Sequence, residues 1–196
     1  VNARFFPPQT AGAGATVGQS GLPFRIDHDE RFNETTHLQY QPWKRGPWYG
    51  FNWRYDSGLV AGSVPFAIDT TTPVDLTILT ADRQQQAGLA CGSQRATLST
   101  PLTTCAPSQY HSNLVSISAP GTENDDHNPP RIAPRNLFDM AVGEDHLFNG
   151  SKYRWSAKLT AVNVTNKYAL YNFLSTFSGT HYVTPRALTG EIGFHF

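Results

Sequence analysis

The alternation of hydrophobic and polar residues predicts its clearest β-strand at residues 48–56. Neighbouring side chains in a strand point to opposite faces, so a period of two gives each face its own character. Here one face is entirely aromatic, while the other is mostly polar. The aromatic residues are Tyr49, Phe51, Trp53 and Tyr55.

Four further segments show the same alternation and are predicted to be strands. They cover residues 31–41, 137–143, 153–165 and 187–196. The five segments are close to the roughly 9–11 residues that a tilted strand needs to cross a bilayer. The hydrophobic faces of the last two segments include Trp155, Ile192 and Phe194.

The connections between these strands alternate between short and long. Residues 42–47 and 144–152 are short, whereas residues 57–135 and 166–186 are long. Outer-membrane barrels have short periplasmic turns and longer extracellular loops. A structureless loop as long as the first one would be unusual in a compact soluble domain. The pattern therefore predicts an all-β, antiparallel transmembrane β-barrel segment with long extracellular loops.

The composition agrees with this class and excludes others. The 196 residues include 15 basic and 15 acidic side chains, and charged residues make up 15%, below the roughly 25% usual for soluble domains. Zero net charge without a basic run argues against a nucleic-acid partner. Aromatic residues at 12% argue against intrinsic disorder. No apolar run is long enough for a transmembrane helix.

The two faces of the strands suggest where their side chains point. Tyr and Trp at strand ends suit a membrane interface, where the ring is buried and the polar tip stays wet. A basic residue facing lipid at the midplane would cost about 2–4 kcal/mol, so the charged face is expected to point into the barrel. The aromatic face has two alternatives, the core of a soluble sandwich or a platform for sugar rings. The expected interior residues are Arg54, Asp56, Lys158, Glu191 and His195.

Two cysteines, Cys91 and Cys105, lie in the first long connection. An even number in a loop-rich segment suggests a disulfide and an oxidising compartment. The alternative is two unrelated thiols. In the same connection, residues 80–89 favour a short helix capped by Thr80, since Asp82 suits a helix N-terminus.

No sequence motif points to catalysis or to a cofactor. The Gly-x-Ser-x-Gly elbow of serine hydrolases is absent, which makes a hydrolase the least favoured class, and the spacing of common zinc sites is absent. Asp125, Asp126 and His127 are weak metal candidates. Calcium could use the carboxylates of Glu123, Asp125 and Asp126 with Asn124 and Asn128, but its twelve-residue loop pattern is absent. The simpler interpretation is a solvated polar loop.

The chain begins at Val1 without a recognisable signal peptide. Small closed barrels start at about 8 strands, so five strands cannot close one. We therefore expect residues 1–196 to be part of one larger barrel domain.

The run Asn163-Val164-Thr165-Asn166-Lys167-Tyr168 resembles the Asn-Leu-Phe/Thr-Asn-Lys motif that closes the penultimate strand in one family, the TonB-dependent outer-membrane receptors. The run Thr184-Pro185-Arg186-Ala187-Leu188 looks like the Pro-Arg that opens their final strand. Gly193-Phe194-His195-Phe196 is similar to their terminal strand. The nearest group has an N-terminal carboxypeptidase-regulatory-like domain.

This resemblance implies a barrel of about 22 strands, of which the chain supplies the last five. It also implies the outer membrane of a Gram-negative bacterium, with Phe196 as the signal read by the barrel assembly machinery. The expected partners are outer-membrane lipid, a transported substrate of unknown identity, and TonB through a missing N-terminal part. Without plug and TonB box, energised transport by this chain alone is not implied. The alternative function is a secreted β-sandwich that binds carbohydrate.

Overall fold

The computed structural model describes residues 28–122, 128–148, 153–175 and 178–196. In these residues the chain is all-β, with antiparallel sheets and one short helix. It divides into two compact units, which we call the sheet unit and the core unit. The sheet unit comprises 32–57, 134–169 and 182–196, and the core unit takes the described residues of 28–31, 58–133 and 170–181.

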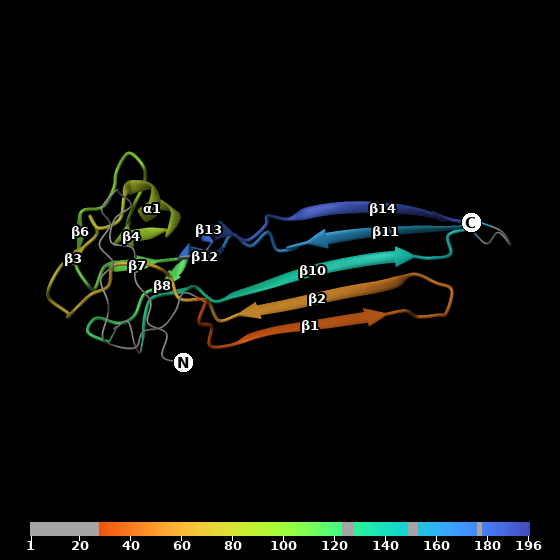
Figure 1. Ribbon diagram of the computed structural model, residues 1–196, viewed down its shortest axis with the longest axis horizontal. Helices are drawn as coiled ribbons and strands as arrows, with labels where there is room; N and C mark the ends of the chain where they lie inside the picture. Colours follow the sequence, from red (N-terminus) through yellow and green to blue (C-terminus); the bar gives the residue numbers. More distant parts are fainter. Residues whose placement is uncertain (1–27, 123–127, 149–152, 176–177) are drawn as a thin grey trace. The chain divides into compact units, whose positions relative to one another are not determined.

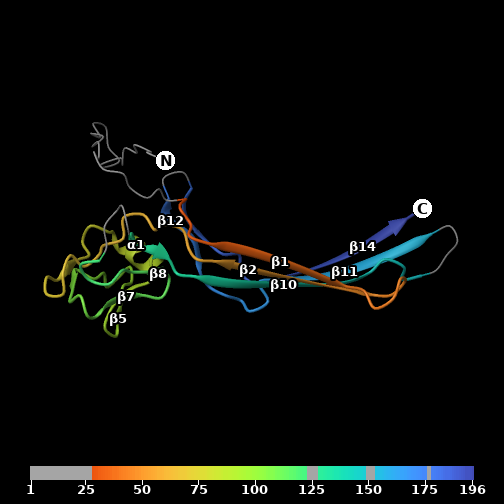
Figure 2. The same ribbon diagram turned by 90° about the horizontal axis from the view of Figure 1, so that it is seen from below.

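The sheet unit is a five-stranded antiparallel sheet whose strands follow one another in chain order. The strands lie side by side in the two perpendicular views of Figure 1 and Figure 2. Each has eight to ten residues. The strand predicted at 137–143 is longer in the structure, and the one predicted at 153–165 is shorter. They are β1 (Asn33–Tyr40), β2 (Trp48–Asp56), β10 (Arg135–Glu144), β11 (Arg154–Val162) and β14 (Ala187–His195).

The register of the sheet aligns the alternating patterns of all five strands. Phe51 lies opposite Leu38 of β1 on one side and Met140 of β10 on the other. Trp155 lies opposite Phe194 where β11 pairs with β14. Because a shift by one residue would turn a strand's hydrophobic set to the other face, this register creates one largely apolar face. Glu34, Thr36 and Asn136 interrupt it near the end where the long connections start.

The short and long connections leave opposite ends of this sheet. Residues 41–47 join β1 to β2, and residues 145–153 join β10 to β11 at the same end (Figure 1). The two longer connections, 57–134 and 163–186, start from the other end of the strands. The alternation predicted from the sequence is therefore present.

The core unit corrects the expectation that residues 57–135 and 166–186 are loops. Most of these residues form a folded unit around a hydrophobic core that includes Leu76, Leu89 and Phe173, all fully buried. Its strands are too short to show a long alternation of hydrophobic and polar residues in the sequence. They are β3 (Val74–Asp75), β4 (Leu89–Cys91), β5 (Gln94–Arg95), β6 (Thr104–Cys105), β7 (Tyr110–Ser112), β8 (Val115–Ser116), β9 (Arg131–Ile132), β12 (Leu170–Ser175) and β13 (Gly179–Tyr182).

The predicted helix is present but shorter, as α1 (Ala81–Gln86). Thr80 is its N-cap residue, yet its hydroxyl donates to the Asp82 carboxylate and makes no capping bond to the backbone. That interaction corrects the expected cap. Gly88, with φ of +63°, follows the helix in a conformation that glycine adopts without strain.

Candidate functional site

The apolar face of the sheet unit is the largest exposed hydrophobic surface predicted from the sequence. Ile192 is 78% exposed, Tyr49 49% and Phe194 47%. Trp155 is also exposed, while the three inner residues of the β2 stripe are only partly exposed because β1 and β10 flank them on both sides. Those three are Phe51, Trp53 and Tyr55.

Aromatic rings on this face contact one another across strands. The ring centroids of Phe51 and Phe138 lie 6.0 Å apart, and those of Trp155 and Phe194 lie 4.9 Å apart. Such pairs stabilise neighbouring strands by about 0.5–1.5 kcal/mol beyond area burial. These contacts between aromatic side chains therefore stabilise the face.

One polar group on the apolar face has a partner that sequence reasoning missed. The indole N–H of Trp53 donates to the side-chain oxygen of Asn136 at 2.9 Å. Asn136 lies opposite Tyr55, so it shares the face of Trp53. An unpaired N–H in an apolar medium would cost several kcal/mol, and Asn136 removes that cost. Nothing in the strand pattern of β10 singled out this residue.

The opposite face of the sheet carries cross-strand ion pairs. Lys158 pairs with Glu191 at 3.3 Å between β11 and β14, and Arg54 pairs with Asp139 at 3.1 Å between β2 and β10. His195 lies 3.4 Å from the hydroxyl of Ser156. The charged residues predicted on one face thus share that face.

A third ion pair on that face has one deeply buried partner. Arg135 has a side chain only 1% exposed and pairs with Asp56 at 2.9 Å. Both residues lie at the end of the sheet from which the long connections start. Removing one partner of a buried pair typically destabilises a protein by about 3–5 kcal/mol, so this pair secures the end of the sheet. The sequence had marked Asp56 but not Arg135.

Trp48 has a role distinct from that of the other aromatic residues of β2. It lies on the charged face, and a Cβ built on Gly143 would fall 2.3 Å from its indole ring. The ring therefore covers the glycine backbone of the neighbouring strand. Trp48 and Trp155 consequently occupy opposite faces of one sheet.

Asn163 ends β11 three residues earlier than the predicted boundary of 165. It is almost fully buried and has φ of +48°, a left-handed conformation that Asn tolerates better than most residues. Its amide donates to the carbonyl oxygens of Lys167 at 3.0 Å and Thr184 at 2.9 Å. Its side-chain oxygen accepts from the backbone N–H of Lys167 at 2.8 Å.

The other residues of this C-terminal motif complete the same turn. The backbone N–H of Asn166 donates to the carbonyl oxygen of Asn163, and the N–H of Arg186 donates to the side chain of Asn166 at 3.0 Å. The turn therefore joins the end of β11 to the start of β14. This gives the Asn-rich motif a structural role that its residues alone explain. Phe196, beyond β14, is 98% exposed.

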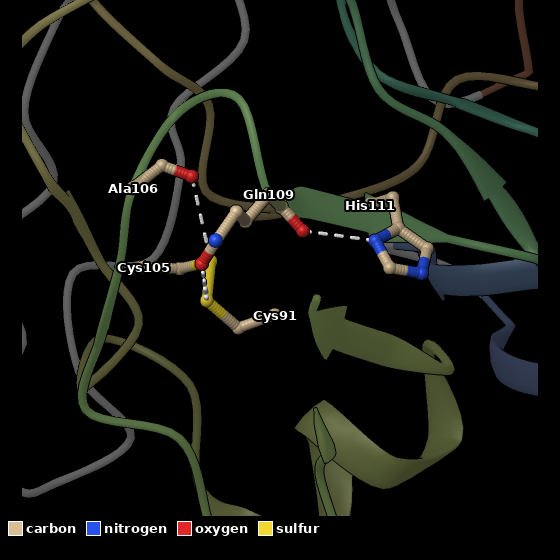
Figure 3. Close-up of a disulfide and its surroundings, with 5 residues drawn as sticks. All are labelled: Cys91, Cys105, Ala106, Gln109 and His111. Carbon is tan, nitrogen blue, oxygen red and sulfur yellow. Dashed lines mark hydrogen bonds between the residues drawn. A yellow bond between two sulfur atoms is a disulfide. The ribbon is translucent and has the colours of Figure 1, made fainter. Parts of the chain in front are cut away.

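In the core unit, Cys91 and Cys105 form a disulfide, the pairing expected from the sequence. Figure 3 shows the bond beside Gln109 and His111. Cys91 belongs to β4 and Cys105 to β6, so the bond links two separate small sheets. Residue Gln109 places its backbone oxygen 2.9 Å from Nδ1 of His111.

A buried glutamine organises the same core around the helix. The amide of Gln84 donates to the carbonyl oxygens of Leu76, Leu79 and Leu102 at 2.8–3.1 Å. Its oxygen accepts from the backbone N–H of Leu102 at 2.8 Å. A buried amide with these partners avoids the cost of unpaired polar groups. The helix pattern had suggested Gln84 only as a helix former.

Asp69, Asp75, Asp82 and Tyr110 of the core unit have shifted pKa values, and two of them illustrate opposite causes. Burial raises the pKa of Tyr110, whose hydroxyl donates to the carbonyl oxygen of Pro65 at 2.9 Å. The backbone and hydroxyl of Thr72, and then those of Thr71, donate to Asp69 and lower the pKa of its carboxyl group. Both arrangements are satisfied within the unit and require no ligand.

The described residues contain no group of three or more metal-binding side chains. The weak candidates Asp125, Asp126 and His127 lie outside the described residues. No helix in the described part of the chain is long and apolar enough to span a membrane.

No family model, no curated protein and no solved structure matches this chain.

Proposed function

We propose that this chain forms part of the wall of an outer-membrane β-barrel, as the C-terminal strands of a TonB-dependent receptor that takes up a substrate. The sheet unit would supply five neighbouring strands. The core unit would belong to the extracellular side and contribute to substrate capture or gating of the lumen. None of the residues described above identifies the transported substrate.

The observation that carries this proposal is the exposed, largely apolar face of five antiparallel strands. Soluble proteins rarely expose a contiguous apolar patch of more than a few hundred Å². The face combines aliphatic residues such as Leu159 and Ile192 with Tyr49 and Trp155, which lie near the end of the sheet that carries the short turns. Lipid is the medium that matches such a face, while the charged opposite face suits a watery interior.

Connection lengths and strand edges support the same proposal. The two short turns share one end of the sheet and the long connections share the other, as in outer-membrane barrels. Among the described residues, no strand pairs with the outer edges of β1 or β14. Long open edges invite pairing with further strands, which a larger barrel would provide.

The competing function, a soluble carbohydrate-binding sandwich, would require the apolar face to be covered by a second sheet or used as a sugar platform. The aliphatic residues Leu38, Leu188 and Ile192 are among its most exposed members. Aliphatic side chains do not stack on sugar rings, so they favour lipid over a saccharide.

The test refolds the full chain into vesicles made with brominated lipids, which quench tryptophan on contact. Trp155 faces the apolar side and Trp48 the charged side. We expect strong quenching of the chain, a marked loss of the quenchable signal in Trp155→Phe, and little change in Trp48→Phe. A chain that folds cooperatively as a monomer without lipid or detergent, unquenched by brominated lipid, would overturn the proposal.

A further inference from the structure

The turn between β1 and β2 combines an exposed indole with two adjacent cations. Trp43 is 65% exposed, and Lys44 and Arg45 follow it at the tip of the turn, both exposed. The turn closes the hairpin directly beyond the cross-strand pair of Tyr40 and Tyr49, so it continues the apolar face.

Local contacts hold this turn in one shape. The side-chain amide of Gln41 donates to the carbonyl oxygen of Gly46 at 2.9 Å, and the N–H of Gly46 donates to the carbonyl oxygen of Trp43 at 3.1 Å. A Cβ on Gly46 would lie 2.6 Å from the indole nitrogen of Trp43. The indole thus lies against Gly46, which leaves the two cations at the tip.

Neither cation forms an ion pair within the described residues. None of the ion pairs found in the described residues includes Lys44 or Arg45, although the charged face of the same sheet has paired Lys158, Arg54 and Arg135. Two unpaired cations beside an interfacial aromatic residue match the chemistry of a phosphate at a lipid surface.

We propose that this turn, Gln41 to Pro47, is a binding site for the headgroup of an anionic phospholipid. It rests on the proposed membrane location of the sheet. Trp43 and the neighbouring tyrosine pair lie at the headgroup boundary, while Lys44 and Arg45 bind the phosphate and any further anionic group. Because the short turns of such sheets face the periplasm, the lipid belongs to the inner leaflet.

The second short turn provides an internal contrast. Its described part, residues 145–148, carries the acidic Asp145 in place of a basic pair. The backbone N–H of His146 donates to the Glu144 carboxylate at 2.9 Å. Over its whole sequence the second turn has one acidic residue, Asp145, and one basic residue, Lys152, whereas the β1–β2 turn has two basic residues and no acidic one. The anionic lipid is therefore assigned to the β1–β2 turn.

The test measures which lipid surrounds the inserted chain. The full chain is refolded into phosphatidylcholine vesicles with a minor fraction of phosphatidylglycerol. In one preparation the phosphatidylglycerol is brominated, and in the other an equal amount of the phosphatidylcholine is brominated. Each basic residue near an anionic surface favours the charged lipid by about fivefold. At low salt we expect brominated phosphatidylglycerol to quench tryptophan more strongly than brominated phosphatidylcholine does. At high salt we expect the two brominated lipids to quench equally.

Variants separate a site from net charge. The double variant Lys44→Gln with Arg45→Gln is expected to lose the preference for phosphatidylglycerol but to keep quenching by phosphatidylcholine. The matched control, Arg83→Gln with Arg95→Gln, removes the same charge from exposed positions of the core unit and is expected to keep the preference. Gly46→Ala, which displaces the indole, is expected to weaken it.

The outcomes distinguish this site from the proposed function. Equal quenching by both lipids in the unsubstituted chain, or equal loss in both double variants, would overturn the lipid site while leaving the membrane location standing. Absence of quenching by either lipid would instead contradict the membrane location itself.

Discussion

The core unit and the sheet unit place the same kinds of hydrophobic residue in opposite environments. All members of the buried hydrophobic cluster belong to the core unit, whereas most of the exposed large hydrophobic side chains belong to the sheet unit. Phe173 is fully buried in one, while Phe194 is about half exposed in the other. The core unit therefore buries its hydrophobic residues, whereas the sheet unit exposes them.

The comparison shows that the length of an alternating segment in the sequence does not indicate how deeply its hydrophobic side chains are buried. The sheet unit has long alternating strands and little buried hydrophobic volume. The core unit has strands of mostly two or three residues and a packed interior with a disulfide. In this chain the long alternating strands form a sheet with two unlike faces, while the short strands surround a hydrophobic core.

The largest expected effect compares Phe173→Ala with Phe194→Ala. Removal of a fully buried phenylalanine costs about 3–5 kcal/mol, so the first variant is expected to expose the core unit's amides to hydrogen exchange. The second is expected to leave those amides protected. Hydrogen exchange followed by mass spectrometry on the chain in vesicles measures both, and equal protection in the two variants would contradict the comparison.

A charge on either face of β14 sharpens the assignment of the sheet. Ile192→Lys places an ammonium group on the apolar face and is expected to destabilise the chain in a bilayer by about 2–4 kcal/mol. Thr189→Lys, on the opposite face of the same strand, is expected to have little effect. Urea titration of the chain refolded in vesicles measures both, and similar losses would contradict the assignment of one face alone to lipid.

Removal of the disulfide is expected to affect only the core unit. The sequence separation between Cys91 and Cys105 is 14, and a loop of about this size corresponds to about 3 kcal/mol in the chain-entropy model. Replacement of both by serine should therefore lower the core unit's hydrogen-exchange protection. Tryptophan quenching in the sheet unit serves as the control, since Trp155 should remain accessible to brominated lipid.

The smallest effect concerns Asp69 of the core unit. Hydrogen bonds from Thr72 and Thr71 lower the pKa of this carboxyl group from its usual 3.8. Its contribution to stability is thus present above pH 3.8 and is lost only as the pH falls through the lower folded-state pKa. The NMR shift of the Asp69 carboxyl carbon should still report the ionised form near pH 3.8, and Thr72→Val should bring its titration closer to the usual range.

Several features of the structure were predictable because they depend on neighbouring residues alone. The strand at 48–56 matches β2 residue for residue, since alternation of aromatic and polar side chains requires a two-sided surface. The predicted end of β11 at 165 was wrong because the turn of Asn163 depends on partners at Lys167 and Thr184. Likewise, no local pattern identifies Asn136 as the partner of Trp53.

The amino-acid sequence by itself determined the long strands, their two unlike faces and the alternation of short and long connections. Each of these follows from the period of two in an extended chain. Only the tertiary structure decided that the described residues of 58–133 and 170–181 share one hydrophobic core, and which side chains of neighbouring strands meet. The reason is physical: burial and cross-strand pairing arise between residues far apart in the chain, and no periodicity within a short segment records its distant partners.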